Sequence, residues 1–254
     1  MGGDLLPSAI HANAVGHPGG GDFVGGYLAA GLSRLRESMG EKYPRVFAIM
    51  GNDDLRSSEA SFVKAETLGV WEYINMKETG LGRFAVFGYS YVPPTPFLLK
   101  DWERYDVSRF VDPGSISPEE GRRSVSTDMR AVRNATIKDD LDSLTKGRDM
   151  SDAIMLFHAP PYDTDLDRAA LDGKTVDHVP LDPHVGSIAV RRFIEAREPL
   201  VTLHGHVHES ARITGSWKDR IGSTYVLSAA HDGPELALVR FSPEDPGSAE
   251  RELL

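Results

Sequence analysis

The chain contains no cysteine, which excludes disulfide bonds, thiolate metal ligands and cysteine nucleophiles. It also has no apolar run near the ~18 residues that a membrane-spanning helix needs. The first residues, MGGDLLPSAI, lack the basic and apolar regions of a secretory signal, so we expect a cytoplasmic protein. With 28 basic against 38 acidic residues, the net charge of −10 argues against binding to nucleic acids or to an anionic membrane.

What remains is the composition of an ordinary globular protein, with 40% hydrophobic and 26% charged residues among 254. Helix-like and strand-like segments alternate, which predicts an α/β fold with helices covering a sheet. We expect one domain over residues 1–242, followed by a polar, frayed tail over residues 243–254.

The predicted elements follow from the spacing of apolar residues. Helices are predicted over residues 23–39, 57–68 (capped by Ser57 or Ser58), 138–144 and 186–196. Strands are predicted over residues 45–50, 83–91, 152–157, 200–203, 224–228 and 235–241. Between residues 101 and 133 the pattern is lost, which predicts a long surface excursion, either a functional lid or a mobile loop.

Polar side chains stand where three of the predicted strands end. The chain continues from these strands as Gly51-Asn52-Asp53-Asp54, as His158-Ala159-Pro160-Pro161 and as His204-Gly205-His206-Val207-His208. In an open α/β sheet, ligands bind beyond the carboxyl ends of the strands, so these segments point to one shared site. If the last segment is extended, His206 and His208 face the same side.

Imidazole, amide and carboxylate groups without sulfur fit a hydrolytic metal site better than a structural zinc site. Each residue also has a structural explanation. Asn52 and Asp53 are typical turn residues, Asp4 is a typical helix cap, and a lone histidine is often simply hydrogen bonded. The prediction of a site therefore rests on their combination at the strand ends.

The segments GGDLLP, GNDD, HAPPYDT and HGHVHES resemble, in this order, motifs of the calcineurin-like metallophosphoesterase superfamily. The stretches FGYSYVPPTPFLLKDWE and GSIAVRRFIEAREPLVTLHGHVHES resemble a prokaryotic branch of small phosphoesterases within it. The resemblance extends from Gly2 to about Phe241. It implies a two-sheet α/β sandwich with two metal ions at the strand ends.

By this resemblance, Asp4 bridges two divalent cations (Mn, Fe, Zn or Ni), Asn52, His158 and His206 complete the second metal site, and His208 ligates the first metal. The implied activity is hydrolysis of a small phosphomonoester or phosphodiester, nucleotides included, by a metal-bound hydroxide at a dinuclear site.

The chain departs from the family pattern at its start, because the Asp-x-His motif of the first metal and the first strands are absent before Asp4. Either the sequence is a shortened chain, or it is a naturally reduced protein with one metal site or none. The second case gives an alternative function, a catalytically impaired phosphate- or nucleotide-binding module on the same fold.

A second departure is Asp53, where many family members have a histidine that protonates the leaving group. Asp53 is either the catalytic acid, which requires a raised pKa, or a residue that orients a ligand. His11 and His17, just past Asp4, are further candidates for the acid.

Other polar residues have less defined roles. His178 and His184 are expected in a solvated loop, and His231 beside Asp232 is either a surface pair or part of the site. The candidates for substrate contacts are Tyr162, Asp163, Trp102, Glu103 and Arg104.

Overall fold

A mixed six-stranded sheet forms the centre of the computed structural model, which describes residues 1–7 and 22–254. Its strands are β3 (Lys77–Leu81), β4 (Phe84–Tyr89), β5 (Ala153–Phe157), β8 (Val201–His204), β9 (Lys218–Ile221) and β10 (Thr224–Ser228). They lie in the order β3-β4-β5-β8-β10-β9, with the middle four parallel and the two edge strands antiparallel. The four parallel strands confirm the predictions over residues 83–91, 152–157, 200–203 and 224–228.

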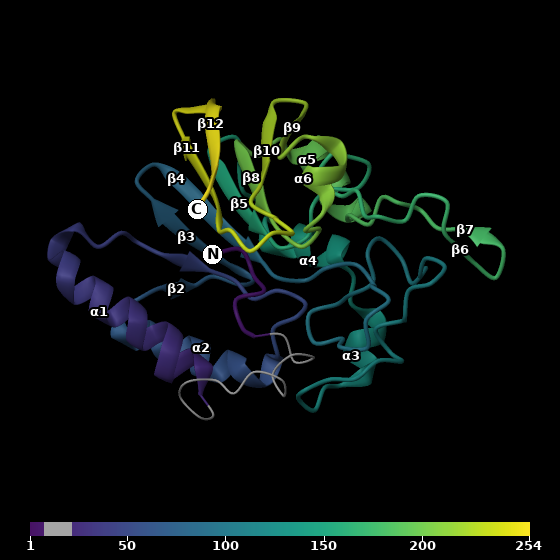
Figure 1. Cartoon of the computed structure of the whole chain (residues 1–254), viewed down its shortest axis with the longest axis horizontal. Coiled ribbons are helices and arrows are strands. Elements are labelled where there is room, and N and C mark those ends of the chain that lie inside the picture. Colours follow the sequence, from purple (N-terminus) through teal and green to yellow (C-terminus); the bar gives the residue numbers. More distant parts are fainter. Residues whose placement is uncertain (8–21) are drawn as a thin grey trace.

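Three two-stranded sheets complete the β structure of the described residues. They are β1 (Phe47–Ala48) with β2 (Glu72–Tyr73), β6 (Thr175–Val176) with β7 (Val179–Pro180), and β11 (Ala237–Ser242) with β12 (Asp245–Leu253). The β6–β7 ribbon projects from the body of the molecule (Figure 1). The first residues lie beside β1, where Gly2 pairs with Ile49 and the Met1 amino group donates to the Phe47 carbonyl at 2.8 Å.

The helices confirm all four helical predictions and add two short ones. They are a π-helical turn (Val24–Ala29) continued by α1 (Ala30–Met39), then α2 (Glu59–Ala65), α3 (Met129–Asn134), α4 (Ile137–Leu144), α5 (Ile188–Arg197) and α6 (Ser210–Thr214), with 3₁₀ turns at Gly40–Lys42, Arg56–Ser58 and Glu66–Leu68. The side chains of Thr136 and Ser187 cap α4 and α5, whereas Ser58 makes no capping bond to α2. No helix in residues 22–254 combines the length and apolarity required to cross a membrane.

The expected frayed tail was wrong. Residues 245–253 form β12, which pairs antiparallel with β11. The strand escaped prediction because its sequence, DPGSAEREL, has a proline, a glycine and four charges. Backbone pairing with β11 and burial of Ala249 against Val201 and Leu227 hold it in place despite this composition.

The excursion over residues 101–133 begins with buried side chains rather than on the open surface. Lys100 and Glu103 form an ion pair of 2.6 Å with both side chains fully buried. Lys100 also donates to the Thr95 carbonyl, and Glu103 accepts from the Thr95 amide and hydroxyl. Trp102 is fully buried as well, so the prediction that Trp102 and Glu103 contact substrate was wrong.

We expect Lys100→Met to lower the free energy of unfolding by about 3–5 kcal/mol near pH 8, because it leaves the Glu103 carboxylate buried without its cation. Burial already raises the pKa of Glu103 to about 7. A carboxyl whose folded pKa lies above its unfolded pKa costs stability as the pH rises, so the loss should be smaller near pH 5. Urea unfolding at both pH values measures this. Lys138→Met, on an exposed pair, is the control, and an equal loss at both pH values would contradict the prediction.

Candidate metal centre

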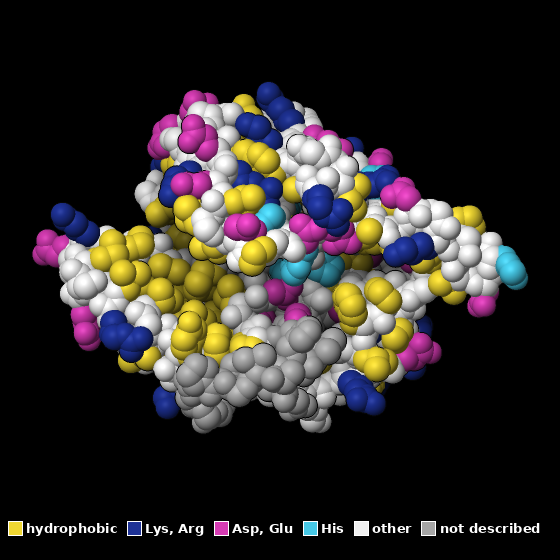
Figure 2. All heavy atoms as spheres, viewed as in Figure 1, with side chains coloured by type: hydrophobic (Ala, Val, Ile, Leu, Met, Phe, Trp, Pro, Cys, Tyr) yellow, Lys and Arg dark blue, Asp and Glu magenta, His cyan; other side chains and the backbone are white. Residues whose placement is uncertain are grey.

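Three of the predicted ligands converge at the carboxyl ends of the parallel strands. Asp4, His158 and His206 each offer one ligand atom, and these atoms all lie within 4.8 Å of one another. His158 directly follows β5, and His206 comes two residues after the neighbouring strand β8. Figure 2 shows histidine and acidic side chains gathered in a hollow in the middle of one face. The sheet therefore brings together residues that are far apart in the sequence.

The His158 ring is oriented by hydrogen-bonding partners on both nitrogen atoms, and its side chain is 2% exposed. Its Nδ1 lies 2.8 Å from the Gly2 carbonyl oxygen. Its Nε2 lies 3.0 Å from Asn52 Oδ1 and 3.1 Å from Asp4 Oδ2. One ring nitrogen and two side-chain oxygens from three separate segments thus face a common point.

The charges at this point favour a carboxylate beside an imidazolium. Burial by itself would lower the pKa of His158, but the Asp4 carboxylate and the bond to Gly2 together raise it above its ordinary value. Burial would raise the pKa of Asp4, but His158 and the Asp53 amide hold it well below its usual range. The proton on Nε2 therefore occupies the place between nitrogen and oxygens that a cation would take.

His206 is held in its neutral form. Its ring centroid lies 5.2 Å from that of His158. Burial, with a further contribution from His158, lowers the pKa of His206 to about 3. Neutral imidazole is the form that binds metal ions, so His206 needs no deprotonation to become a ligand.

The expected extended segment from His206 to His208 was wrong. His206 has a left-handed φ of 71°, and the Val207 amide donates to the Gly205 carbonyl at 2.9 Å, so the chain turns here. His208 is exposed and lies outside the cluster of Asp4, His158 and His206. Its charge still contributes to lowering the pKa of His206, which places it in the vicinity. Its role as a ligand stays a prediction.

His204 is a structural histidine that motif reasoning left without a role. Its Nδ1 lies 2.8 Å from the Ala159 carbonyl and its Nε2 lies 2.8 Å from the Thr202 hydroxyl. Burial lowers the pKa of His204 to about 4, so the ring is neutral. The carbonyl then requires the proton on Nδ1, and Nε2 accepts from Thr202. The bond between His204 Nδ1 and the Ala159 carbonyl joins the end of β8 to the residue after His158.

Asp54 is another buried group that the sequence did not single out. It is fully buried, and its two carboxylate oxygens accept bonds from the amides of Leu6 and Gly51. Burial and the neighbouring Asp4 raise the pKa of Asp54 to about 6. Asp53, by contrast, is half-buried, and its amide donates to Asp4 Oδ1 at 2.9 Å. The role of the Asp53 side chain as the acid stays a prediction.

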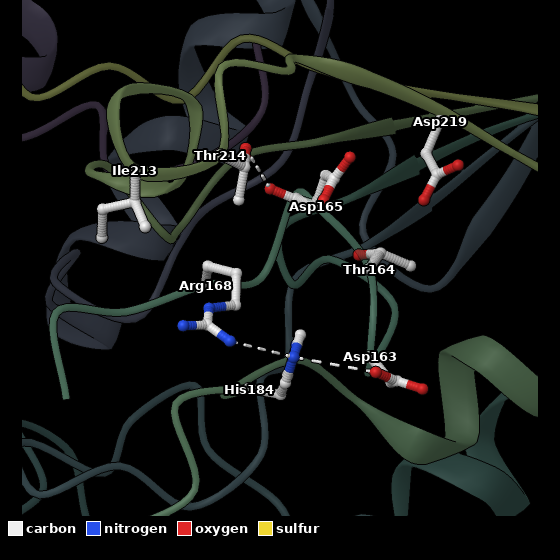
Figure 3. Close-up of a pocket in the computed structure, with 8 residues that line it drawn as sticks. All are labelled: Asp163, Thr164, Asp165, Arg168, His184, Ile213, Thr214 and Asp219. Carbon is white, nitrogen blue, oxygen red and sulfur yellow. Dashed lines mark hydrogen bonds and ion pairs between the residues drawn. The ribbon is translucent and has the colours of Figure 1, made fainter. Parts of the chain in front are cut away.

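A separate cavity of about 450 Å³ lies between the loop after β5, α6 and β9 (Figure 3). It is lined by Asp163, Thr164, Asp165, Arg168, His184, Ile213, Thr214 and Asp219. The expectation of a solvated His184 was wrong, because Asp167, fully buried, lies 2.7 Å from its Nδ1. Of the predicted substrate contacts, Asp163 lines this cavity.

The remaining polar residues take different places. The Tyr162 hydroxyl donates to Asp182, and Arg104 pairs with Asp140. His231 contacts Glu235 at 3.0 Å, while Asp232 pairs with Arg212. His178 is exposed in the turn between β6 and β7. His11 and His17 lie outside the described residues.

The sequence matches no family model and no curated protein, but nine chains of known structure match its fold. One crystal structure superposes with a TM-score of 0.51 at 17% identity, over 89% of this chain and 72% of its own. TT1561 of Thermus thermophilus gives 0.46 at 13% identity, over 89% of this chain and 79% of that one. A candidate 5′-nucleotidase from Staphylococcus aureus, solved with alpha-ketoglutarate, gives 0.42 at 13% identity, over 99% of this chain and 44% of that one.

These structural likenesses bear on the fold alone. The first of them supports the mixed α/β architecture described above. At 17% identity it carries no information about a reaction or a ligand. The function therefore has to be argued from the residues of the site.

Proposed function

We propose that the protein hydrolyses small phosphate esters with the help of a divalent cation held by Asp4, Asn52, His158 and His206. The observation that carries the proposal is the orientation of His158. Its Nδ1 is bonded to a backbone carbonyl, while its Nε2 faces Asp4 and Asn52. Histidines that bind metals commonly donate their second ring N–H in this way, which fixes the ring and its tautomer.

The donor set fits a hydrolytic divalent cation. One carboxylate, one amide oxygen and two imidazoles are the ligands that manganese, iron, zinc and nickel share. A bound cation of this kind polarises a phosphoryl oxygen and lowers the pKa of water. The residues themselves contribute the pocket: Asp4 supplies the negative charge, and the buried His158 and half-buried His206 supply the imidazole nitrogens. We propose His208 as a ligand of a second cation and Asp53 as the group that protonates the leaving oxygen.

The test is hydrolysis of p-nitrophenyl phosphate and of bis-p-nitrophenyl phosphate by metal-free protein, with and without added Mn²⁺. We expect release of nitrophenol that depends on Mn²⁺ with at least one of the two esters. Elemental analysis of the protein should show bound metal. Bound metal without hydrolysis of either ester would favour the alternative, a phosphate-binding module, and absence of any divalent metal would contradict the proposed metal-dependent hydrolysis.

Binding of Mn²⁺ should release about one proton per site near pH 6, because the cation displaces the proton of His158. The pKa of His158 lies above its ordinary value, so the affinity should rise with pH until this pKa is passed and then level off. His206, with a pKa of about 3, contributes no proton in this range. Calorimetry in buffers of different ionisation enthalpy counts the protons. A Mn²⁺ affinity that does not rise with pH below the pKa of His158 would contradict the assignment of His158 as a ligand.

A further inference from the structure

The loop that carries Asp4 and the loop that carries Asn52 are joined by the carboxylate of Asp54. Its Oδ1 accepts from the Leu6 amide at 2.8 Å, and its Oδ2 accepts from the Gly51 amide at 2.8 Å. Leu6 follows Asp4 by two residues, and Gly51 directly precedes Asn52. The Asp54 side chain therefore holds the backbone close to two candidate ligands, Asp4 and Asn52.

A carboxylate suits this position for two reasons. Both of its oxygens accept, so each backbone N–H has a charged partner, and such bonds are stronger than neutral ones. Asp54 is also fully buried, where an unpaired backbone N–H would be costly. The Asp54 amide donates in turn to the Gly51 carbonyl at 3.2 Å, which closes the turn over residues 51–54.

Another hydrogen bond between the two loops involves the side chain of Asp4, a candidate ligand. The Asp53 amide donates to Oδ1 of Asp4, the same carboxylate whose Oδ2 faces His158. The two segments also pair at Gly2 and Ile49, ahead of Asp4 and Gly51. Beyond that pair, the Asp53–Asp4 bond uses an oxygen that is itself a candidate to bind the cation. The bonds of Asp54 engage no candidate ligand atom, so they can set the distance between the loops with or without the cation.

We propose that Asp54 is a positioning residue of the metal centre, which holds Asp4 and Asn52 at the spacing needed to ligate one cation together with His158. The proposal rests on the proposed function only in requiring a cation at this site. Asp54 itself has both oxygens directed to backbone amides, so it acts through its neighbours and not as a ligand.

The test compares Asp54→Asn with Asp101→Asn in the full chain. Asp101 is equally buried and also accepts backbone bonds, from Arg56 and Ser124, neither of which is a candidate ligand. An asparagine at either position keeps the size of the side chain and turns one acceptor into a donor that faces an N–H. Both variants should therefore lower the thermal unfolding midpoint of the metal-free protein.

Calorimetric titration with Mn²⁺ separates positioning from stability. We expect Asp54→Asn to weaken Mn²⁺ binding by about 10–100-fold, the range found when groups that orient metal ligands are replaced. Asp101→Asn should bind Mn²⁺ like the unmodified protein. If Asp54→Asn does not fold, as judged by circular dichroism, Asp54→Ser, which keeps one acceptor in a smaller side chain, takes its place.

Unchanged Mn²⁺ affinity in a folded Asp54 variant would overturn the proposal, even if its unfolding midpoint falls. This result differs from failure of the proposed function, which is read on the unmodified protein. If the unmodified protein binds Mn²⁺ but hydrolyses no ester, the function fails and the affinity comparison still decides the role of Asp54. If the unmodified protein binds no Mn²⁺, both are overturned.

Discussion

Replacing His158 with alanine should abolish both Mn²⁺ binding and Mn²⁺-dependent ester hydrolysis. The substitution removes the nitrogen that faces Asp4 and Asn52 and leaves these two oxygens without their common partner. Loss of a metal ligand should weaken Mn²⁺ binding by more than the ~10–100-fold that loss of an orienting group costs. Calorimetry with Mn²⁺ and the nitrophenyl phosphate assay measure the two effects.

Two controls make this result specific. His178→Ala removes an exposed imidazole from the turn between β6 and β7 and should change neither binding nor hydrolysis. Circular dichroism is needed for His158→Ala because the ring is buried and its loss leaves a cavity. A folded His158→Ala protein that binds Mn²⁺ as tightly as the unmodified chain would refute the proposed centre.

The parallel core of the fold was predictable because its strands carry a strong and simple signal. Every residue of β5 (AIMLF) is apolar, which is the pattern expected of a strand that is buried along its whole length. The edge strands β3 (KETGL) and β9 (KDRI) were missed because one side faces solvent and their residues are largely polar. Their pairing comes from the neighbouring strands β4 and β10, which no local pattern reveals.

The site was predictable to a different extent. The motif segments singled out Asp4, Asn52, His158 and His206, and the structure brings these four together. His204 lies in the same segment as His206, yet both of its ring nitrogens are hydrogen bonded, to Ala159 and Thr202. His204 therefore has a structural role. Sequence spacing could not separate the two, because it does not show that β8 ends at His204 and that the chain turns at His206.

The roles of buried carboxylates are also difficult to predict from the sequence. Asp54 and Asp167 are both fully buried, and each accepts bonds from backbone amides of two segments. A sequence marks both simply as acidic residues in loops, where solvent exposure is the usual expectation. Their role depends on amides that are 48 residues away, in the case of Leu6 and Asp54, or 19 residues away, in the case of Gly186 and Asp167.

The close approach of the loops at the centre depends on glycine. Gly3 has a left-handed φ of 98°, and a Cβ added to it would lie 2.5 Å from His158 Nδ1 and 2.8 Å from the Gly51 backbone. A Cβ added to Gly51 would lie 2.5 Å from the Asp4 amide nitrogen and 2.6 Å from His158 Cε1. Gly3 and Gly51 therefore pack against each other next to Asp4 and His158, and neither position has space for a side chain.

Gly51→Ala should consequently disrupt the centre as strongly as the loss of a ligand. The added methyl group would collide with both Asp4 and His158, whose 3.1 Å approach defines the site. We expect Mn²⁺ binding to be lost and the free energy of unfolding to fall by about 3 kcal/mol, at the upper end of the cost of overpacking. Gly80→Ala, on the exposed strand β3 with nothing near the added Cβ, should change neither quantity. A Gly51→Ala protein with normal stability and normal Mn²⁺ affinity would show that these loops do not pack as closely as described.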